Sequence, residues 1–423
     1  MIRSHEVLTS KEMLGFQEVI QANAGQTFVV IGLDDSVNQW LCPEVLQIIR
    51  EGECFSGGVR HRELVSHLLP TEARWIDITV PLEDAFEAYR QEKRVIVFTS
   101  GDPLFSGFGT TIKKRIPEAE IQVFPFFNSL QVLAHRLLLA YEDMRVVSLT
   151  GRPWEAFDRA LIEQVAKIGL LTDRKKTPQA IAQRMMDYGY HNYTMVVGEH
   201  LGNKQLERVR PFSLEEVGDQ VFEYPNNVLL TRSDDHSRPR LFGIPDDQFE
   251  LLNGRAKMIT KAPIRLITLS TLELYKHRSF WDIGFCTGSI SIEAKLQFPH
   301  LRITAFEIRP EGERLMEINS RRFGTPDITT VIGDFTQTDL SAYPLPDAVF
   351  IGGHGGKLKE IIQKVRSLLL PEGVLVFNSV SPESKQEFIE ISTECGFIIR
   401  SIQKVSVNDF NPIEIIQAIL LPE

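Results

Sequence analysis

Short apolar runs alternate with amphipathic stretches along the whole sequence. The runs have the length of buried strands, and the stretches between them have the spacing of helices. This alternation is typical of α/β domains with largely parallel sheets. In the first half we predict strands at residues 27–31, 94–99, 121–124, 146–149, 194–198 and 228–231.

The pattern starts again after a polar, proline-containing stretch at residues 234–240. The second half predicts strands at 279–283, 302–307, 329–332, 348–351 and 374–378, a terminal strand pair near 398–405 and 414–420, and helices at 288–297, 311–323 and 358–369. This order predicts a Rossmann-like domain with a closing hairpin. We therefore expect an N-terminal extension over residues 1–26, a first domain over 27–235 and a second over 241–423.

Composition agrees with two globular domains. The chain has 423 residues, of which 43% are hydrophobic and 24% charged, so each half can bury its own core. The net charge of −10 argues against a nucleic-acid partner, although one cleft can still hold an anionic substrate. We find no apolar stretch of the roughly 20 residues that span a bilayer, so we expect no membrane partner.

The four cysteines (Cys42, Cys54, Cys286 and Cys395) are scattered, without a C-x-x-C pair. This predicts neither a disulfide framework nor a metal site, and it fits a reducing compartment. The N-terminal residues lack the basic and apolar regions of a signal peptide. We therefore expect a cytoplasmic protein.

The clearest motif of the second half is FWDIGFCTGSISIEAK, where a predicted strand passes through a glycine-containing turn into a helix. Ligands bind beyond the carboxyl ends of such strands, and the helix N-terminus offers free amides to a carboxylate. Glu307 ends the next strand and can accept ribose hydroxyls. Asp334 and Phe335 follow the third strand and can bracket an adenine ring. Together they predict a nucleoside pocket.

A dinucleotide site is the close competitor, because NAD enzymes place an acid where Glu307 lies. The turn reads G-F-C-T-G, however, and not G-x-G-x-x-G. Cys286 occupies the second glycine position, where a pyrophosphate needs the closest approach. We therefore favour a mononucleoside ligand.

Residues 241–423, with LFGIPDDQFELLNGRAKMITKAPIRLITLSTLEL, WDIGFCTGSISIEA and VFIGGHGG, resemble the decarboxylating C15-methyltransferases of corrin biosynthesis. The resemblance implies S-adenosylmethionine as cofactor, with Glu307 at the ribose and Asp334 and Phe335 near the adenine. It further implies contacts from Thr260, Asp282, Gly284, Phe285, Cys286, Thr287 and Gly288. Phe285 and Cys286 replace smaller residues that are usual in the family's turn.

The first half carries the motif VFTSGDPLFSGFGTTI, in which Gly101, Asp102 and Pro103 follow a predicted strand. By itself this pattern is a tight turn, in which Asp102 can accept backbone N–H bonds and hold the loop rigid. Related loops follow at residues 127–131, 149–152 and 197–202.

In order and spacing, these loops resemble the tetrapyrrole methyltransferases, in particular the C5-methylating member of the corrin pathway. The resemblance covers roughly residues 28–232 and implies a fold of two α/β lobes. It also implies S-adenosylmethionine contacts from Gly101, Asp102, Pro103, Ser129 and Gly151. The family's opening G-x-G-P-G turn is absent. In its place stand Gly32, Leu33, Asp34 and Asp35, and we expect the two acids to form a turn.

Both resemblances imply one enzyme that methylates a precorrin or cobalt-precorrin at C5 and C15 and removes CO₂ from the ring C acetate, in cobalamin synthesis. The main task of such an enzyme is to align the nucleophilic ring carbon with the methyl group of the cofactor. We name no catalytic base; Lys261, Arg265 and His354 can grip substrate carboxylates or have structural roles. The alternatives are a methyltransferase with another substrate, such as RNA or a protein, and a non-catalytic tetrapyrrole-binding protein. Relatives of both halves suggest a homo-oligomer.

Overall fold

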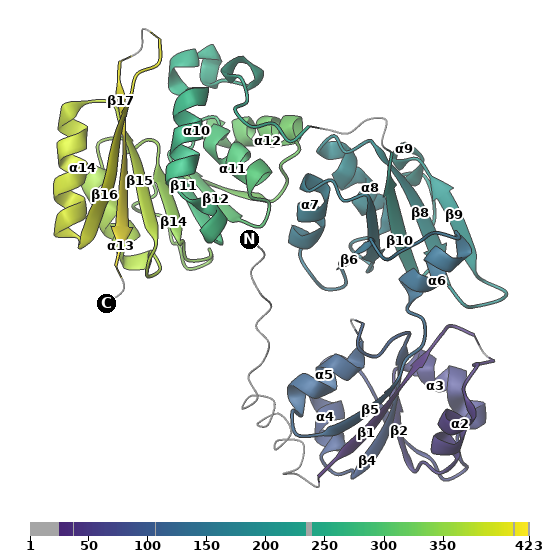
Figure 1. Ribbon diagram of the computed structural model, residues 1–423. Coiled ribbons are helices and arrows are strands. Elements are labelled where there is room, and N and C mark those ends of the chain that lie inside the picture. Colours follow the sequence, from purple (N-terminus) through teal and green to yellow (C-terminus); the bar gives the residue numbers. More distant parts are fainter. Residues whose placement is uncertain (1–24, 37, 106, 234–238, 409–410, 422–423) are drawn as a thin grey trace. The chain divides into compact units, whose positions relative to one another are not determined.

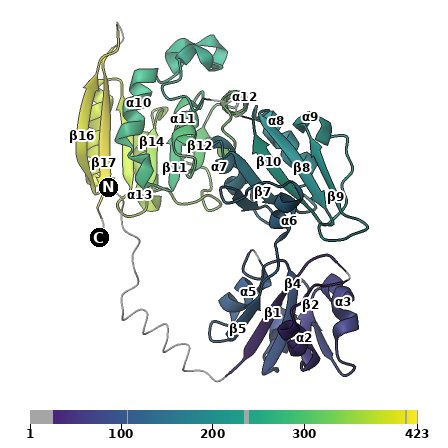
Figure 2. The ribbon, with the colours of Figure 1, turned by 45° about the vertical axis from the view of Figure 1, so that its right-hand side comes forward.

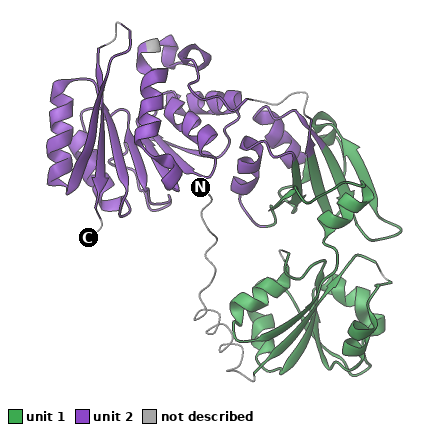
Figure 3. Ribbon diagram, in the orientation of Figure 1, with its two compact units in different colours: residues 1–150, 167–178, 195–230 green, residues 151–166, 179–194, 231–423 purple. Residues whose placement is uncertain are grey.

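The computed structural model describes residues 25–421, apart from 37, 106, 234–238 and 409–410 (Figure 1). Most of the predicted extension (1–26) and of the predicted linker (234–240) lies outside the described residues. The chain forms two compact units: the first comprises residues 1–150, 167–178 and 195–230, and the second 151–166, 179–194 and 231–423 (Figure 3). In the part of the chain that is described, no helix is long and apolar enough to cross a membrane.

The first sheet is entirely parallel, with the strand order β3-β2-β4-β1-β5. Its strands are β1 (Thr27–Leu33), β2 (Cys54–Gly57), β3 (Arg74–Asp77), β4 (Arg94–Ser100) and β5 (Glu120–Phe124). Its helices are α2 (Pro43–Arg50), α3 (Val59–Val65), α4 (Glu83–Tyr89) and α5 (Phe108–Arg115). The helices α2 and α3 lie on one side of the sheet and α4 and α5 on the other (Figure 1), and an apolar cluster covers each face.

The second sheet has the order β6-β7-β10-β8-β9. Its strands are β6 (Arg145–Ser148), β7 (Lys167–Leu171), β8 (Tyr193–Glu199), β9 (Arg208–Phe212) and β10 (Asn226–Arg232), and the helices of this region are α6 (Ser129–Arg136), α7 (Glu155–Ile162), α8 (Pro178–Asp187) and α9 (Leu214–Val217). The strands β6 and β7 are parallel, whereas the edge strand β9 is antiparallel to β8.

The third sheet has seven strands in the order β13-β12-β11-β14-β15-β17-β16. The strands are β11 (Ser279–Ile283), β12 (Arg302–Glu307), β13 (Ile328–Ile332), β14 (Ala348–Ile351), β15 (Val374–Ser379), β16 (Phe397–Val405) and β17 (Ile413–Leu420), and the helices are α10 (Ala262–Thr271), α11 (Ser289–Gln297), α12 (Glu311–Phe323), α13 (Leu358–Leu368) and α14 (Pro382–Glu394). The pair β16–β17 is the predicted hairpin, antiparallel at one edge of an otherwise parallel sheet (Figure 2).

The predicted α/β class is confirmed, and each predicted strand is present within three residues of its predicted ends. Four strands of the first half were missed. The strands β2 (CFSG) and β3 (RWID) contain only two apolar residues each, too few to form an apolar run. In β9, two arginines and Pro211 interrupt the apolar pattern, so the strand was not predicted. Proline is tolerated there because β9 lies at the sheet edge.

Candidate active sites

In the second unit, the chain order of the third sheet reverses between β11 and β14. Open α/β sheets bind ligands beyond the carboxyl ends of strands at such a switch point. Here the turn after β11 touches the loop after β14. Gly284 has φ +77°, and a Cβ at this position would lie 2.5 Å from the carbonyl oxygen of Gly353. Gly284 is therefore required by the contact between two loops, and this contact forms one wall of the candidate site.

Glu307, the last residue of β12, is only 3% exposed. Its Oε2 accepts the amide of Cys286 (2.9 Å). Its Oε1 accepts the amide (3.0 Å) and the guanidinium (3.3 Å) of Arg309. Because a carboxylate has about four acceptor positions, one remains free, and the half-exposed Arg309 side chain is the contact that a ligand can displace. This geometry fits a carboxylate that binds hydroxyl groups.

Asp334 follows β13 and is held on both oxygens. Its Oδ2 contacts Nζ of Lys357 at 2.5 Å, and its Oδ1 accepts the amide and the hydroxyl of Thr336. The hydrogen bond from Lys357, followed by those from Thr336, lowers the pKa of Asp334 to about 2. The neighbouring Phe335 packs edge-on against Phe306, with ring centroids 5.0 Å apart.

One cavity brings together four of the predicted residues: Gly284, Glu307, Asp334 and Phe335. Its walls also contain residues that directly follow strand ends, of which the sequence analysis had singled out only His354: Ile308, Arg309, Gly353, His354, Gly355 and Lys357. Their position just past β12 and β14 was the feature of the sequence from which their place at the cavity could have been predicted. They supply the cationic groups of this cavity.

The remaining predicted residues of this half do not line the cavity: Thr260, Asp282, Phe285, Cys286, Thr287 and Gly288. Asp282 is fully buried beneath the turn, where its Oδ2 accepts the hydroxyl of Ser291 at 2.6 Å. Burial raises the pKa of Asp282 to about 7. Phe285 and Cys286 point into apolar clusters. Their assignment as cofactor contacts stays a prediction, and the structure places their side chains behind the turn.

Arg265 has the structural role that the sequence left open. Its side chain is fully buried, and it pairs with Glu293 at 3.1 Å and Asp246 at 3.2 Å. It also donates to the carbonyl oxygen of Thr260 at 2.6 Å. Arg265 therefore anchors the segment before α10, and its guanidinium does not face a substrate.

In the first unit, a cavity of about 600 Å³ lies beyond the carboxyl ends of β1 and β4. This volume is within the roughly 300–1,000 Å³ that is usual for small-molecule sites. Gly101 and Ser129 of the predicted residues line it, together with Thr150 next to the predicted Gly151. Asp102 and Pro103 lie in the same loop but not on the cavity wall. Asp102 accepts the amide of Leu104 at 2.8 Å, as expected for an acid that stiffens the turn.

Gly32 has a similar role to Gly284. A Cβ on Gly32 would lie 1.8 Å from the carbonyl oxygen of Gly101 and 2.7 Å from the amide nitrogen of Phe126. The ends of β1, β4 and β5 therefore converge on a space where no side chain fits. This convergence explains why glycine is retained at position 32.

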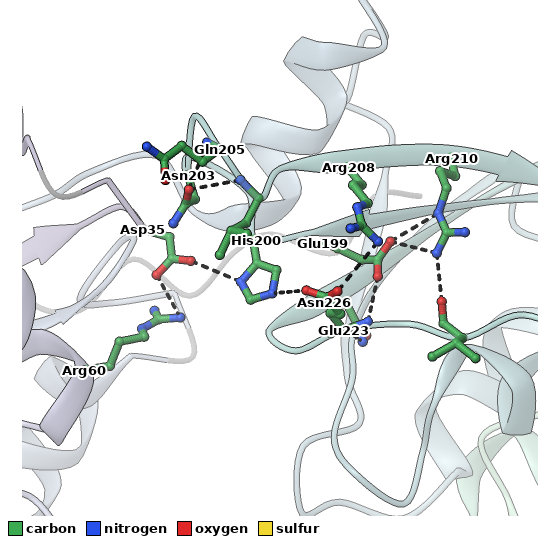
Figure 4. A network of polar contacts seen from close by, with 12 residues as sticks. Asp35, Arg60, Glu199, His200, Asn203, Gln205, Arg208, Arg210, Glu223 and Asn226 are labelled. Atoms are coloured by element: carbon green, nitrogen blue, oxygen red, sulfur yellow. Dashed lines mark hydrogen bonds and ion pairs between the residues drawn. The ribbon is translucent and has the colours of Figure 1, made fainter.

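Asp34 and Asp35 differ in their surroundings. Asp34 forms the expected turn, because its Oδ1 accepts the amide of Ser36 at 2.9 Å, and burial raises its pKa. Asp35 instead enters a polar network (Figure 4). It lies 3.2 Å from Arg60 and 3.6 Å from Nδ1 of His200, whose Nε2 lies 3.2 Å from Glu223. This network could not be predicted from the sequence, because its members come from four separate segments.

The hydroxyl of Ser100, at the end of β4, accepts two hydrogen bonds at the cavity wall. Arg60 donates to its Oγ at 3.0 Å. The amide of Gly58 donates to Nδ1 of His61 at 3.2 Å, so the neutral ring carries its proton on Nε2 and donates to Ser100 Oγ at 3.0 Å. Burial, and then Arg60, lowers the pKa of His61 to about 4, which keeps the ring neutral. The Ser100 hydroxyl therefore remains a donor toward a ligand.

Two domain families match this chain. Residues 29–218 match the tetrapyrrole (corrin/porphyrin) methylases, and residues 253–418 match the precorrin methyltransferase domain. A precorrin-6Y C(5,15)-methyltransferase [decarboxylating] from Sinorhizobium sp. is 32% identical over 370 residues, which are 87% of this chain and 88% of that protein. The chain belongs to the precorrin-6Y C(5,15)-methyltransferase family.

Two further proteins are similar to parts of this chain. The cobalt-precorrin-6B C(15)-methyltransferase (decarboxylating) of Salmonella typhimurium is 39% identical over 133 residues, which are 31% of this chain and 68% of that protein. The crystal structure of a precorrin-6Y C5,15-methyltransferase from Geobacter metallireducens is 35% identical and covers 43% of this chain and 98% of its own, with a TM-score of 0.39.

Membership of the precorrin-6Y C(5,15)-methyltransferase family makes this chain an S-adenosylmethionine-dependent C-methyltransferase. The predicted function class is therefore confirmed. The two alternatives, a methyltransferase with an unrelated substrate and a non-catalytic binding protein, are not supported by these relatives.

Proposed function

We propose that this chain transfers methyl groups from S-adenosylmethionine to C5 and C15 of a precorrin or cobalt-precorrin and removes CO₂ from the ring C acetate. The observation that carries the proposal is the presence of two separate cavities, each at the carboxyl ends of parallel strands and each in a different methyltransferase domain. One cavity serves C5 and the other C15.

In the second unit, Glu307 would hold the ribose and Asp334 and Phe335 the adenine. The fit is supported by the free acceptor position of Glu307 and by its burial. Because both oxygens of Asp334 already have partners, an adenine amine would share this carboxylate with Lys357. His354 and Lys357 lie on the same cavity wall and are the groups that we assign to the substrate's carboxylates.

In the first unit, Gly101, Ser129 and Thr150 would contact the cofactor, and Arg60 and Ser100 would donate to a ligand. S-adenosylmethionine supplies an electrophilic methyl group when bound. The methyl leaves sulfur without the bonding electron pair, and a nucleophilic ring carbon forms the new bond. The residues of this chain orient the reactants and exclude water, which alone can supply several kcal/mol.

We further propose a homo-oligomer that works in the cytoplasm. Trp40 of the first unit is 86% exposed and lines an apolar cavity together with Phe126 and Phe127, which supports a partner surface on this unit. The described cysteines are all free, as in a reducing compartment. Light scattering at several protein concentrations tests the assembly state.

The deciding experiment incubates the full chain with S-adenosylmethionine and either a metal-free or a cobalt-containing precursor. Mass spectrometry should find two added methyl groups and the loss of one CO₂. The variant Glu307→Gln should add the C5 methyl alone. A chain that binds S-adenosylmethionine but alters neither precursor would contradict the proposal.

A further inference from the structure

Two segments of the first domain belong to the same compact unit as the second domain. Residues 151–166 carry α7, residues 179–194 carry most of α8, and both lie in the unit that contains residues 231–423 (Figure 3). The third sheet and its helices form the rest of this unit. Apolar, hydrogen-bonding and charged contacts join the two segments to it.

The apolar contact is made by Ile162, the last residue of α7, which is 1% exposed. It belongs to one buried cluster with residues from the segment before α10, the turn after β11, and α11, β12 and α12: Ile244, Phe249, Ile259, Phe285, Ile292, Leu296, Ala305, Met316 and Phe323. A side chain from α7 thus completes the core that lies behind the turn of the second active site.

The hydrogen-bonding contact is made by Tyr190, which is 3% exposed and follows α8. Its hydroxyl donates to the carbonyl oxygen of Gly324 at 2.7 Å. Gly324 is the C-cap of α12 and has φ +67°. The last carbonyls of a helix have no partner within the helix, so Tyr190 supplies from another segment a donor that α12 lacks.

The charged contact brings an ion pair of the helices α7 and α8 close to an ion pair of the second domain. Arg184 of α8 holds Asp158 of α7 through two bonds of 2.6 Å. Lys295 of α11 holds Asp327 at 3.1 Å. Asp158 is fully buried and Lys295 is 1% exposed, and the charges of Asp327 and Lys295 both act on Asp158. Two ion pairs cross the contact itself: Arg302–Glu155 (3.2 Å) and Arg321–Asp187 (3.7 Å).

We propose that this contact is a specific docking surface, and that it holds the two domains together without the covalent connection through residues 234–238. The occupant is the helix pair α7–α8 of the same chain. An incidental contact between tethered domains would remain polar and hydrated, because the tether alone keeps the partners near. This contact instead buries an isoleucine and a hydrogen-bonded tyrosine, with two ion pairs around them, which is how an interface of independent affinity is built.

The experiment inserts a protease recognition sequence between residues 234 and 238 of the full chain and cleaves the folded protein. On size exclusion at about 1 μM, a Kd below this concentration keeps the halves together. The cut parent should elute as one species at the same volume as the uncut chain. Elution of two separate fragments would overturn the proposal.

Two variant pairs test the residues. Tyr190→Phe removes only the hydroxyl and should weaken the association of the cut halves about tenfold, whereas Tyr275→Phe, at an exposed tyrosine of the second domain, should leave it unchanged. Ile162→Asp should separate the halves, and Ile398→Asp, at an exposed isoleucine of β16, should not.

Circular dichroism of each uncut variant establishes that it is folded. If Ile162→Asp does not fold, the comparison of Tyr190→Phe with Tyr275→Phe decides the question. Equal affinities between the halves of these two cut variants would overturn the proposal even if the parent halves stay together.

Discussion

The backbone amide of Cys286 donates to Oε2 of Glu307 at 2.9 Å, and Cys286 has φ +53° to do so. A non-glycine residue in the left-handed region costs of the order of 1 kcal/mol or more, and such strain collects at functional sites. The turn after β11 thus holds the carboxylate at the end of β12 in place. The position of Glu307 depends on backbone geometry and not only on its own side chain.

We expect Glu307→Gln to weaken S-adenosylmethionine binding at the second site by about 10- to 100-fold, because the amide cannot accept the same hydrogen bonds as the carboxylate. Isothermal titration calorimetry should find two sites per chain in the parent and one in the variant at the same cofactor concentration. Glu311→Gln, at an exposed position in the first turn of α12, is the control and should retain both sites.

Gly32→Ala should remove cofactor binding from the first unit only. The Cβ of the alanine would lie 1.8 Å from the carbonyl oxygen of Gly101, so the loop after β4 would have to move. We expect about 1–3 kcal/mol of destabilisation, measured by urea unfolding. Gly218→Ala is the matched control in the same unit, because a Cβ added there would meet nothing within 4 Å. Loss of both sites in Gly32→Ala would show that the two cavities are not independent.

Asp282 predicts a pH dependence of stability. Its folded pKa of about 7 lies above the usual 3.8, so the native state binds the proton more tightly than the unfolded state. The contribution of Asp282 to stability is therefore full below pH 4, declines as the pH rises to 7 and is constant above it.

Asp282→Asn abolishes this decline. Relative to the parent, the variant should gain unfolding free energy between pH 4 and pH 8, at most about 4 kcal/mol for a shift of roughly three pKa units. Denaturant unfolding of both proteins at several pH values measures the difference. A difference that does not change with pH would contradict an ionisation of Asp282 in this range.

Arg60→Gln should slow C5 methylation about tenfold. The substitution removes a donor to Ser100 and leaves Asp35, which is 9% exposed, without its cationic partner. Methylation at C15 in the same reaction mixture is an internal control and should not change. Arg62→Gln, two residues further along α3 with its guanidinium over Trp75, carries the same loss of charge and should retain C5 activity.

The second half was predictable from sequence to a greater extent than the first. The strands β11, β12 and β14 have the predicted bounds, because their apolar runs end at a glycine or at a charged residue. The same strand ends predicted Glu307 and Asp334 at one cavity, since parallel strands bring their carboxyl ends to one edge.

The sequence could not predict which side of the turn each residue faces. Phe285 and Cys286 look like pocket residues in a linear motif, yet their side chains lie in the core. The network of Asp35, Arg60 and His200 joins segments that are up to 165 residues apart. No local sequence pattern predicts contacts between such distant segments, because these contacts depend on how the loops after β1 and β8 pack. The docking role of Tyr190 was hidden for the same reason.

The close approach of the Gly32 backbone to the Gly101 backbone also limits how this protein can be redesigned. A loop transplanted from another enzyme onto the end of β4 would fit only if its backbone passed β1 as closely as Gly101 does. Engineers who wish to reshape the first pocket for a different macrocycle therefore have to exchange the β1 and β4 ends as a matched pair.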